Sequence, residues 1–133
     1  MEVEKFEELV VEALSDLPAE FRDKLENIDV VVRDRPTPRQ LARVGLRRGW
    51  TLLGLYEGVP RTKRTTGYNL VLPDRITLFQ KPIEAKCRSE EEIADEVRRV
   101  VSHEIAHYFG IDDHSLRSIE RSKLRRANKK MRP

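Results

Sequence analysis

The sequence predicts a single α+β domain, and three observations point to it. Apolar residues recur at helical spacing near the start of the chain and again after residue 89. Between these stretches lie short β-branched and apolar runs bounded by proline or glycine, which are typical of strands. The chain has 133 residues, 38% of them hydrophobic, which suits one domain with a real core. Helices that precede and follow the strands favour α+β architecture.

Two helices are expected at the N-terminus. A stripe at helical spacing predicts the first, over residues 3–14, from Phe6, Leu9, Val10, Ala13 and Leu14. Residues 15–18 contain a serine, an aspartate and a proline, which end this helix. A short second helix is expected to follow, with Phe21 and Leu25 on its inner face.

Four runs are expected to be strands: residues 28–33, 50–56, 69–72 and 75–79. Residues 34–39 contain two prolines and are expected to form a loop. Pro73 and Asp74 are a turn pair between the last two runs.

The clearest element is a helix that begins after Ser89. Ser89 and Glu92 match the capping-box pattern Ser-x-x-Glu, and Ile93, Val97, Val100, Val101 and Ile105 follow as a helical stripe. Gly110 is expected to end this helix because glycine readily takes a positive φ. A last helix is expected from about Ser115. The domain is predicted to span residues 1–120, followed by a basic, flexible tail over residues 121–133.

The charge is unevenly distributed. The net charge is +3, yet residues 117–133 carry eight basic residues and one acidic residue, so the other 116 residues sum to −4. The basic tail could neutralise phosphates, which makes nucleic-acid binding one alternative function. The single cysteine, Cys87, excludes an intramolecular disulfide and a cysteine-based zinc site. The sequence shows neither a signal peptide nor a membrane span, which predicts a cytoplasmic protein without a membrane partner.

The strongest functional motif is His103-Glu104-Ile105-Ala106-His107. Two histidines four residues apart lie on one face of a helix, about 6 Å apart along its axis, where one zinc ion can accept both. Glu104 follows the first histidine, as in the H-E-x-x-H pattern of zinc hydrolases. The alternative is a set of surface residues paired with Arg98 or Arg99.

The motif continues as His-Glu-x-x-His-x-x-Gly-x-x-Asp, with Gly110 and Asp113 in the added positions. Metzincins have a histidine where Asp113 stands. A glycine at this place lets the chain turn so that a third ligand reaches the metal. The third ligand is predicted to be Asp113, with His114 and then Asp112 as alternatives.

At this point the sequence resembles the minimal zincin-like family of small predicted zinc-dependent proteases with a matrix-metalloprotease-like (metzincin-like) domain. The long motif carries the resemblance, together with residues 53–58 (LGLYEG) and 72–76 (LPDRI). The resemblance implies a minimal zincin-like fold, with a small mixed sheet packed on an active-site helix and N-terminal helices beside it. It also implies zinc bound by His103, His107 and Asp113, with Glu104 as the catalytic base.

The expected function is therefore a zinc-dependent hydrolase, a metallopeptidase in which Glu104 acts on a zinc-bound water. Its partner would be a peptide or protein substrate. Two roles are open for the strand expected over residues 75–79: it aligns this substrate at the cleft rim by strand addition, or it is an ordinary edge strand. Two other functions stay open: a zinc-binding interaction protein without catalytic activity, and nucleic-acid binding through the basic tail.

Overall fold

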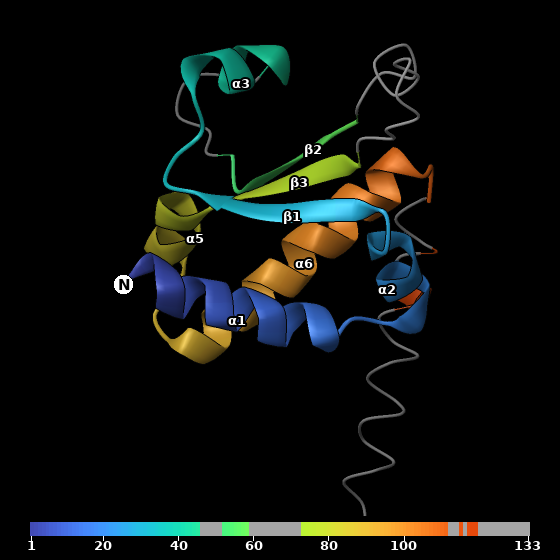
Figure 1. Ribbon diagram of the computed structural model, residues 1–133, viewed down its shortest axis with the longest axis horizontal. Coiled ribbons are helices and arrows are strands. Elements are labelled where there is room, and N and C mark those ends of the chain that lie inside the picture. Colours follow the sequence, from blue (N-terminus) through green and yellow to red (C-terminus); the bar gives the residue numbers. More distant parts are fainter. Residues whose placement is uncertain (46–51, 59–72, 112–114, 116, 120–133) are drawn as a thin grey trace, which may run out of the picture.

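A computed structural model describes residues 1–45, 52–58, 73–111, 115 and 117–119. These residues form a three-stranded mixed sheet with its main helices packed below it in the view of Figure 1. The predicted α+β class is confirmed. The hydrophobic core lies between the sheet and two long helices, one from each end of the chain.

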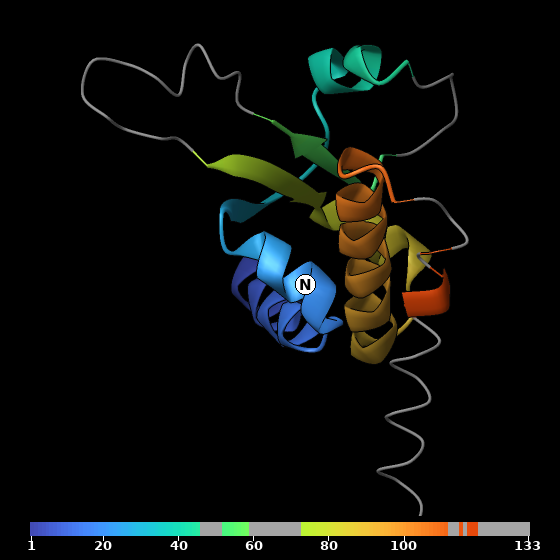
Figure 2. The same cartoon turned by 90° about the vertical axis from the view of Figure 1, so that its right-hand side faces the viewer.

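The N-terminal helices are as predicted. Helix α1 (Val3–Ser15) buries Phe6, Leu9, Val10 and Ala13, and it packs along the C-terminal long helix, α6 (Glu90–Tyr108). Helix α2 (Ala19–Leu25) follows Pro18 and buries Phe21 completely. Both helices therefore lie on the core side of the sheet (Figure 2).

The sheet has the strand order β1-β3-β2. Strand β1 (Ile28–Arg33) pairs in parallel with β3 (Asp74–Phe79), and β2 (Gly54–Glu57) pairs antiparallel with β3. Ile76 and Leu78 of β3 are fully buried. The expected strand at residues 75–79 is confirmed, but its expected place at the cleft rim is wrong, because β3 is paired on both sides. Strand β2 lies next to the motif at residues 103–107 of α6, and one of its edges is not paired by any described strand.

Two sequence predictions about the ends of elements were wrong. The strand expected over residues 50–56 begins only at Gly54. Residues 52 and 53 are not part of a strand, and residues 50 and 51 lie outside the described part. The loop expected over residues 34–39 ends early, because helix α3 (Pro38–Arg43) begins there. Thr37 and Gln40 form a full capping box and Pro38 opens the helix, a position that proline favours.

Helix α5 (Gln80–Lys86) was not expected, and it follows β3 directly. Its inner face carries Ile83, which is fully buried. The expected strand over residues 69–72 lies outside the described residues. Ser115 and residues 117–119 are helical, in line with the helix expected from about Ser115. Among the described helices, none is long and apolar enough to cross a membrane.

Helix α6 begins as predicted at Ser89, whose hydroxyl oxygen accepts a hydrogen bond from the Glu92 amide at 3.1 Å. The reciprocal half of the capping box differs from the prediction. The Glu92 carboxylate accepts from the amide of Arg88, at 2.6 Å, instead of the amide of Ser89. The predicted stripe is confirmed, since Ile93, Val97, Val100, Val101 and Ile105 are all buried.

Close packing of α6 against β2 depends on Gly54. A Cβ atom added at Gly54 would lie 2.5 Å from Cγ1 of Val100 and 3.3 Å from the carbonyl oxygen of Thr77. The first distance is shorter than any ordinary contact, so only a residue without a side chain lets the helix approach the strand this closely. This approach brings the end of α6 to the edge of β2.

We predict that Gly54→Ala destabilises the protein by about 1–3 kcal/mol, because the new methyl group overpacks the contact with Val100. In a Val100→Ala background the same substitution should be much less destabilising, since the clashing methyl is gone. Urea denaturation of the two single variants and the double variant measures this coupling. Gly58→Ala is the comparison, because its Cβ would meet Tyr108, at 3.1 Å from the hydroxyl oxygen and 3.3 Å from a ring carbon, and would not meet α6 at Val100. Strictly additive effects would show that the helix contact is not the constraint.

Candidate active site

The last two turns of α6 carry His103, Glu104 and His107. Their neighbours Ser102, Ile105 and Ala106 are buried and anchor this part of the helix in the core. Both histidines are exposed and Glu104 is half-buried. Because His103 and His107 are four residues apart in one continuous helix, both imidazoles leave the same face. The prediction that His103 and His107 lie on one face of a helix is therefore confirmed.

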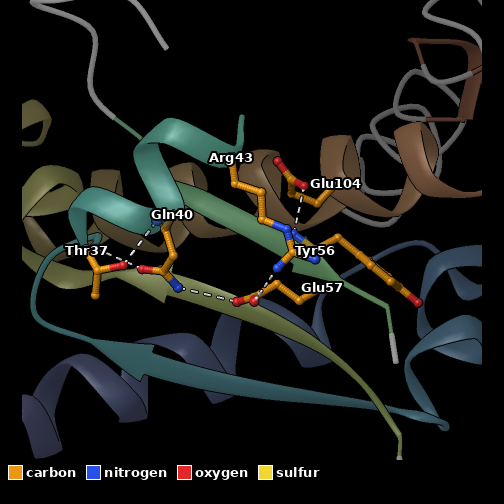
Figure 3. Close-up of polar contacts among 6 residues, drawn as sticks. All are labelled: Thr37, Gln40, Arg43, Tyr56, Glu57 and Glu104. Carbon is orange, nitrogen blue, oxygen red and sulfur yellow. Dashed lines mark hydrogen bonds and ion pairs between the residues drawn. The ribbon is translucent and has the colours of Figure 1, made fainter. Parts of the chain in front are cut away.

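Glu104 is joined to the edge strand. Its Oε2 atom accepts a hydrogen bond from the backbone N–H of Tyr56 at 3.0 Å (Figure 3). Tyr56 is paired with Ile76 of β3 in the ladder. Because the Tyr56 amide binds Glu104 of α6, it points away from β3, toward the edge of β2 that no described strand pairs. Burial raises the pKa of Glu104, although this amide and the two neighbouring imidazoles partly oppose the increase.

The side chain of Tyr56 is held at both its ring and its hydroxyl. The hydroxyl donates to Oδ2 of Asp74 at 2.6 Å, and Asp74 is only 9% exposed. The ring stacks on Tyr108, with centroids 3.9 Å apart and planes 15° apart. Phe109 meets both rings edge-on. Tyr108 therefore packs on Tyr56 and fixes the strand residue whose amide binds Glu104.

Tyr56 and Asp74 were not among the predicted site residues. Their contacts join positions 48 and 18 residues apart in the chain, and no local spacing rule reports such pairs. The signal that could have found them is the family resemblance, because both lie in the two short segments that carry it, residues 53–58 and 72–76.

The end of α6 has the geometry expected from Gly110. Gly110 has a φ of 71°. Its amide donates to the carbonyl of His107 at 3.4 Å, and the amide of Ile111 donates to the carbonyl of Ala106 at 2.8 Å. These are the two hydrogen bonds of a Schellman motif, which turns the chain sharply away from the helix axis. Ile111 then packs on the core, so the chain leaves the helix at a fixed point just after His107.

The three candidates for the third ligand, Asp112, Asp113 and His114, lie outside the described residues. Within the part of the chain that the structure describes, no three His, Cys, Asp or Glu side chains group together as a metal site. The alternative was a surface cluster paired with Arg98 or Arg99. Arg98 pairs with Asp16 and Asp95, and Arg99 pairs with Glu96.

The donor set fits zinc. Two exposed imidazoles on one helical face match the nitrogen ligands that zinc accepts, and a third, oxygen or nitrogen, ligand completes such catalytic sites. Glu104 is turned to the strand edge by its bond to Tyr56, which leaves it beside the imidazole face instead of in it. The two imidazoles can bind a metal while the carboxylate of Glu104 stays off it. Such a set leaves a metal position open, as in catalytic zinc sites and unlike closed structural sites.

We predict that Glu104→Gln stabilises the metal-free protein at pH 7, because the neutral amide avoids the cost of burying a charge. Because the folded-state pKa of Glu104 is raised, its charged form destabilises the fold above that pKa, and the penalty disappears as the pH falls toward the ordinary value of a glutamate. The gain should therefore shrink in acid. Thermal unfolding across this pH range measures it, with Glu12→Gln on the exposed face of α1 as control. Equal stability of wild type and Glu104→Gln at neutral pH would contradict the argument.

The chain was also compared with known proteins. A family model described as zincin-like metallopeptidase matches residues 25–123, which include β1, the sheet, α6 and the whole H-E-x-x-H motif. A search of curated proteins gave no match. Members of this family are zinc-dependent peptidases in general. The model covers most of the chain, and the protein belongs to the zincin-like metallopeptidase family.

Proposed function

We propose that the protein is a zinc metallopeptidase in which His103 and His107 hold the metal and Glu104 is the general base. The observation that carries this proposal is the hydrogen bond between Glu104 and the Tyr56 amide. It holds the carboxylate of the H-E-x-x-H motif at the edge of β2 that no described strand pairs, and an extended peptide chain would pair along that edge.

The proposed ligand set is His103, His107 and Asp113, with His114 as the alternative to Asp113. The sharp turn at Gly110, with its φ of 71°, supports this set, because it redirects the chain within one helical turn of His107. Bound zinc supplies Lewis acidity, which polarises a scissile carbonyl and acidifies water. An aspartate ligand would add negative charge and make the metal a weaker Lewis acid than three histidines would.

Glu104 moves the proton in the proposed reaction. One carboxylate oxygen takes a proton from the attacking water, whose oxygen forms the new bond to the carbonyl carbon of the peptide. Glu104 then delivers that proton to the amide nitrogen as the C–N bond breaks. One water molecule is consumed, and Glu104 returns to its starting state. Its bond to the Tyr56 amide keeps the carboxylate at the strand edge throughout the resting state.

The substrate would bind along β2, not along residues 75–79 as the sequence suggested. Among the described strands, β2 pairs with β3 alone, along one of its two edges. The outward amide of Tyr56 shows which backbone groups face the other side, and residues two apart share that direction. An extended peptide pairing there by strand addition would bring its backbone to the carboxylate of Glu104.

We predict about one zinc ion per chain in the purified wild-type protein, lost in His103→Ala and in one of Asp113→Ala or His114→Ala, because a three-ligand site cannot lose a ligand without a large loss of affinity. Plasma mass spectrometry of the protein measures the stoichiometry. Circular dichroism is the control for folding, since the hydrophobic core does not depend on the metal. A wild type that takes up no zinc when it is offered would refute the site.

We also predict that Glu104→Gln keeps its zinc but loses peptidase activity by about 10²-fold or more, because the amide retains the contact to Tyr56 but cannot accept a proton. A fluorogenic peptide library assays the turnover of the zinc-loaded protein, with Glu12→Gln as the control. A zinc-binding interaction protein without catalytic activity would show no turnover in the wild type either. Full activity in Glu104→Gln would remove Glu104 as the base.

A further inference from the structure

The basic residues of the chain are concentrated in two segments, and one of them contains the edge strand β2. Residues 35–64 carry eight Lys or Arg and a single acidic residue, Glu57, which gives this segment a net charge of +7. Residues 117–133, which include the tail, also carry a net charge of +7, so the rest of the chain carries −11. Part of the first segment is described, and it consists of α3, residues near it and β2.

Helix α3 is fastened to β2 through Glu57. The Nε2 atom of Gln40 donates to Oε1 of Glu57 at 3.4 Å, and Nη1 of Arg43 lies 3.5 Å from Oε2 of the same carboxylate. Oε1 of Gln40 also accepts from the amide of Thr37, which closes the capping box (Figure 3). The start of α3 and its attachment to the strand thus share one side chain.

The attachment puts α3 next to the catalytic carboxylate. Glu57 binds α3, and Tyr56, the residue before it in β2, binds Glu104 of α6. Successive strand residues are about 3.3 Å apart along the strand. Figure 3 shows side chains of both helices meeting β2 at these two neighbouring residues. The edge of β2 that no described strand pairs therefore lies near α6 with its motif and α3 with its arginines.

On the side of β2 that faces α3, the carboxylate of Glu57 is already engaged. Glu57 pairs with Arg43 and lies opposite Arg75 of β3 in the ladder, and Arg75 has Asp29 of β1 on its other side. Arg39 lies four residues before Arg43 on α3, so the two share a helix face. Arg39 is exposed and makes no ion pair with any described residue. Its guanidinium therefore carries a positive charge that no described carboxylate balances.

We propose that the peptidase selects acidic substrates: extended segments whose Asp or Glu side chains bind the arginines of α3, Arg39 foremost, while their backbone pairs with β2. This selectivity rests on the proposed function and names its substrate class. Alternate side chains of an extended peptide point to the same side, so acidic residues at every second position would face α3 together. Arginine suits this role because its planar fork binds a carboxylate through two hydrogen bonds.

A nucleic acid also carries negative charge, but the described surface suits it less well. The half-buried ring of Tyr56 stacks on Tyr108, so that face of the ring is closed to a base. A peptide backbone, by contrast, supplies the carbonyl groups that a strand edge pairs with.

The test is binding of peptides of about ten residues, with alternating Glu-Ala, Gln-Ala or Lys-Ala sequence and a neutral fluorophore, measured by anisotropy on the full chain. Measurements with and without zinc, at about 0.02 M and 0.15 M salt, separate charge attraction from metal binding. A single-stranded RNA of similar charge is the competing probe. Because the measurement is of binding and not of turnover, failure of the proposed catalysis would leave its result readable.

We expect the Glu-Ala peptide to bind more tightly than the Gln-Ala and Lys-Ala peptides. Arg39→Gln should weaken this binding about two- to fivefold, and Arg39→Glu should weaken it further. The matched controls are Arg88→Gln and Arg88→Glu at the far end of α6, and Lys129→Gln with Lys130→Gln in the tail, all of which should leave the preference unchanged. Equal binding of the Glu-Ala and Gln-Ala peptides, a preference that depends on the tail lysines instead of Arg39, or tighter Arg39-dependent binding of the RNA would each overturn the proposal.

Discussion

The hydrogen bond between the Glu104 carboxylate and the Tyr56 amide is the contact on which the arrangement of the site depends. It joins a helix to the open edge of a sheet, and it forms only because two other conditions are met. Gly54 lets α6 approach β2 to within the contact distance of Val100. Tyr56 is clamped between Asp74 and Tyr108, so its amide direction is held by a side chain fixed at both ends.

This arrangement places a carboxylate where it destabilises the fold. Burial raises the pKa of Glu104, and a single amide together with two neighbouring imidazoles compensates only in part. A purely structural helix end would carry a neutral or apolar residue at this position. The core of α1, α6 and β3 offsets the free-energy cost of this buried carboxylate. Its side chains Phe6, Ile76, Val97 and Ile105 are all fully buried. Strained or costly groups of this kind tend to cluster at functional sites.

The sequence predicted what depends on local spacing and missed what depends on distant contacts. Helix α6, its start at Ser89 and its turn at Gly110 follow from rules that act within four residues, and the structure confirms them. The edge and central strands could not be told apart, because β2 and β3 are both short and apolar and their order is set by pairing. Helix α3 was missed although Thr37 and Gln40 carry a capping signal, since two nearby prolines favoured a loop. The third zinc ligand stays a prediction.

If acidic peptides pair with β2 as proposed, two kinds of recognition would act at its edge. Backbone pairing is nearly independent of sequence, so it can align many extended peptides but cannot choose among them. Choice must come from side chains beside the edge, and α3 is held there by contacts to Glu57 that are 3.4 and 3.5 Å long. The contact between Arg43 and Glu57 is long and solvent-exposed, so it is weak. A substrate carboxylate could therefore compete with Glu57 for Arg43 at little cost. Acidic residues in the substrate would then do for α3 what Glu57 does in the free protein, which makes the attachment of α3 itself part of substrate selection.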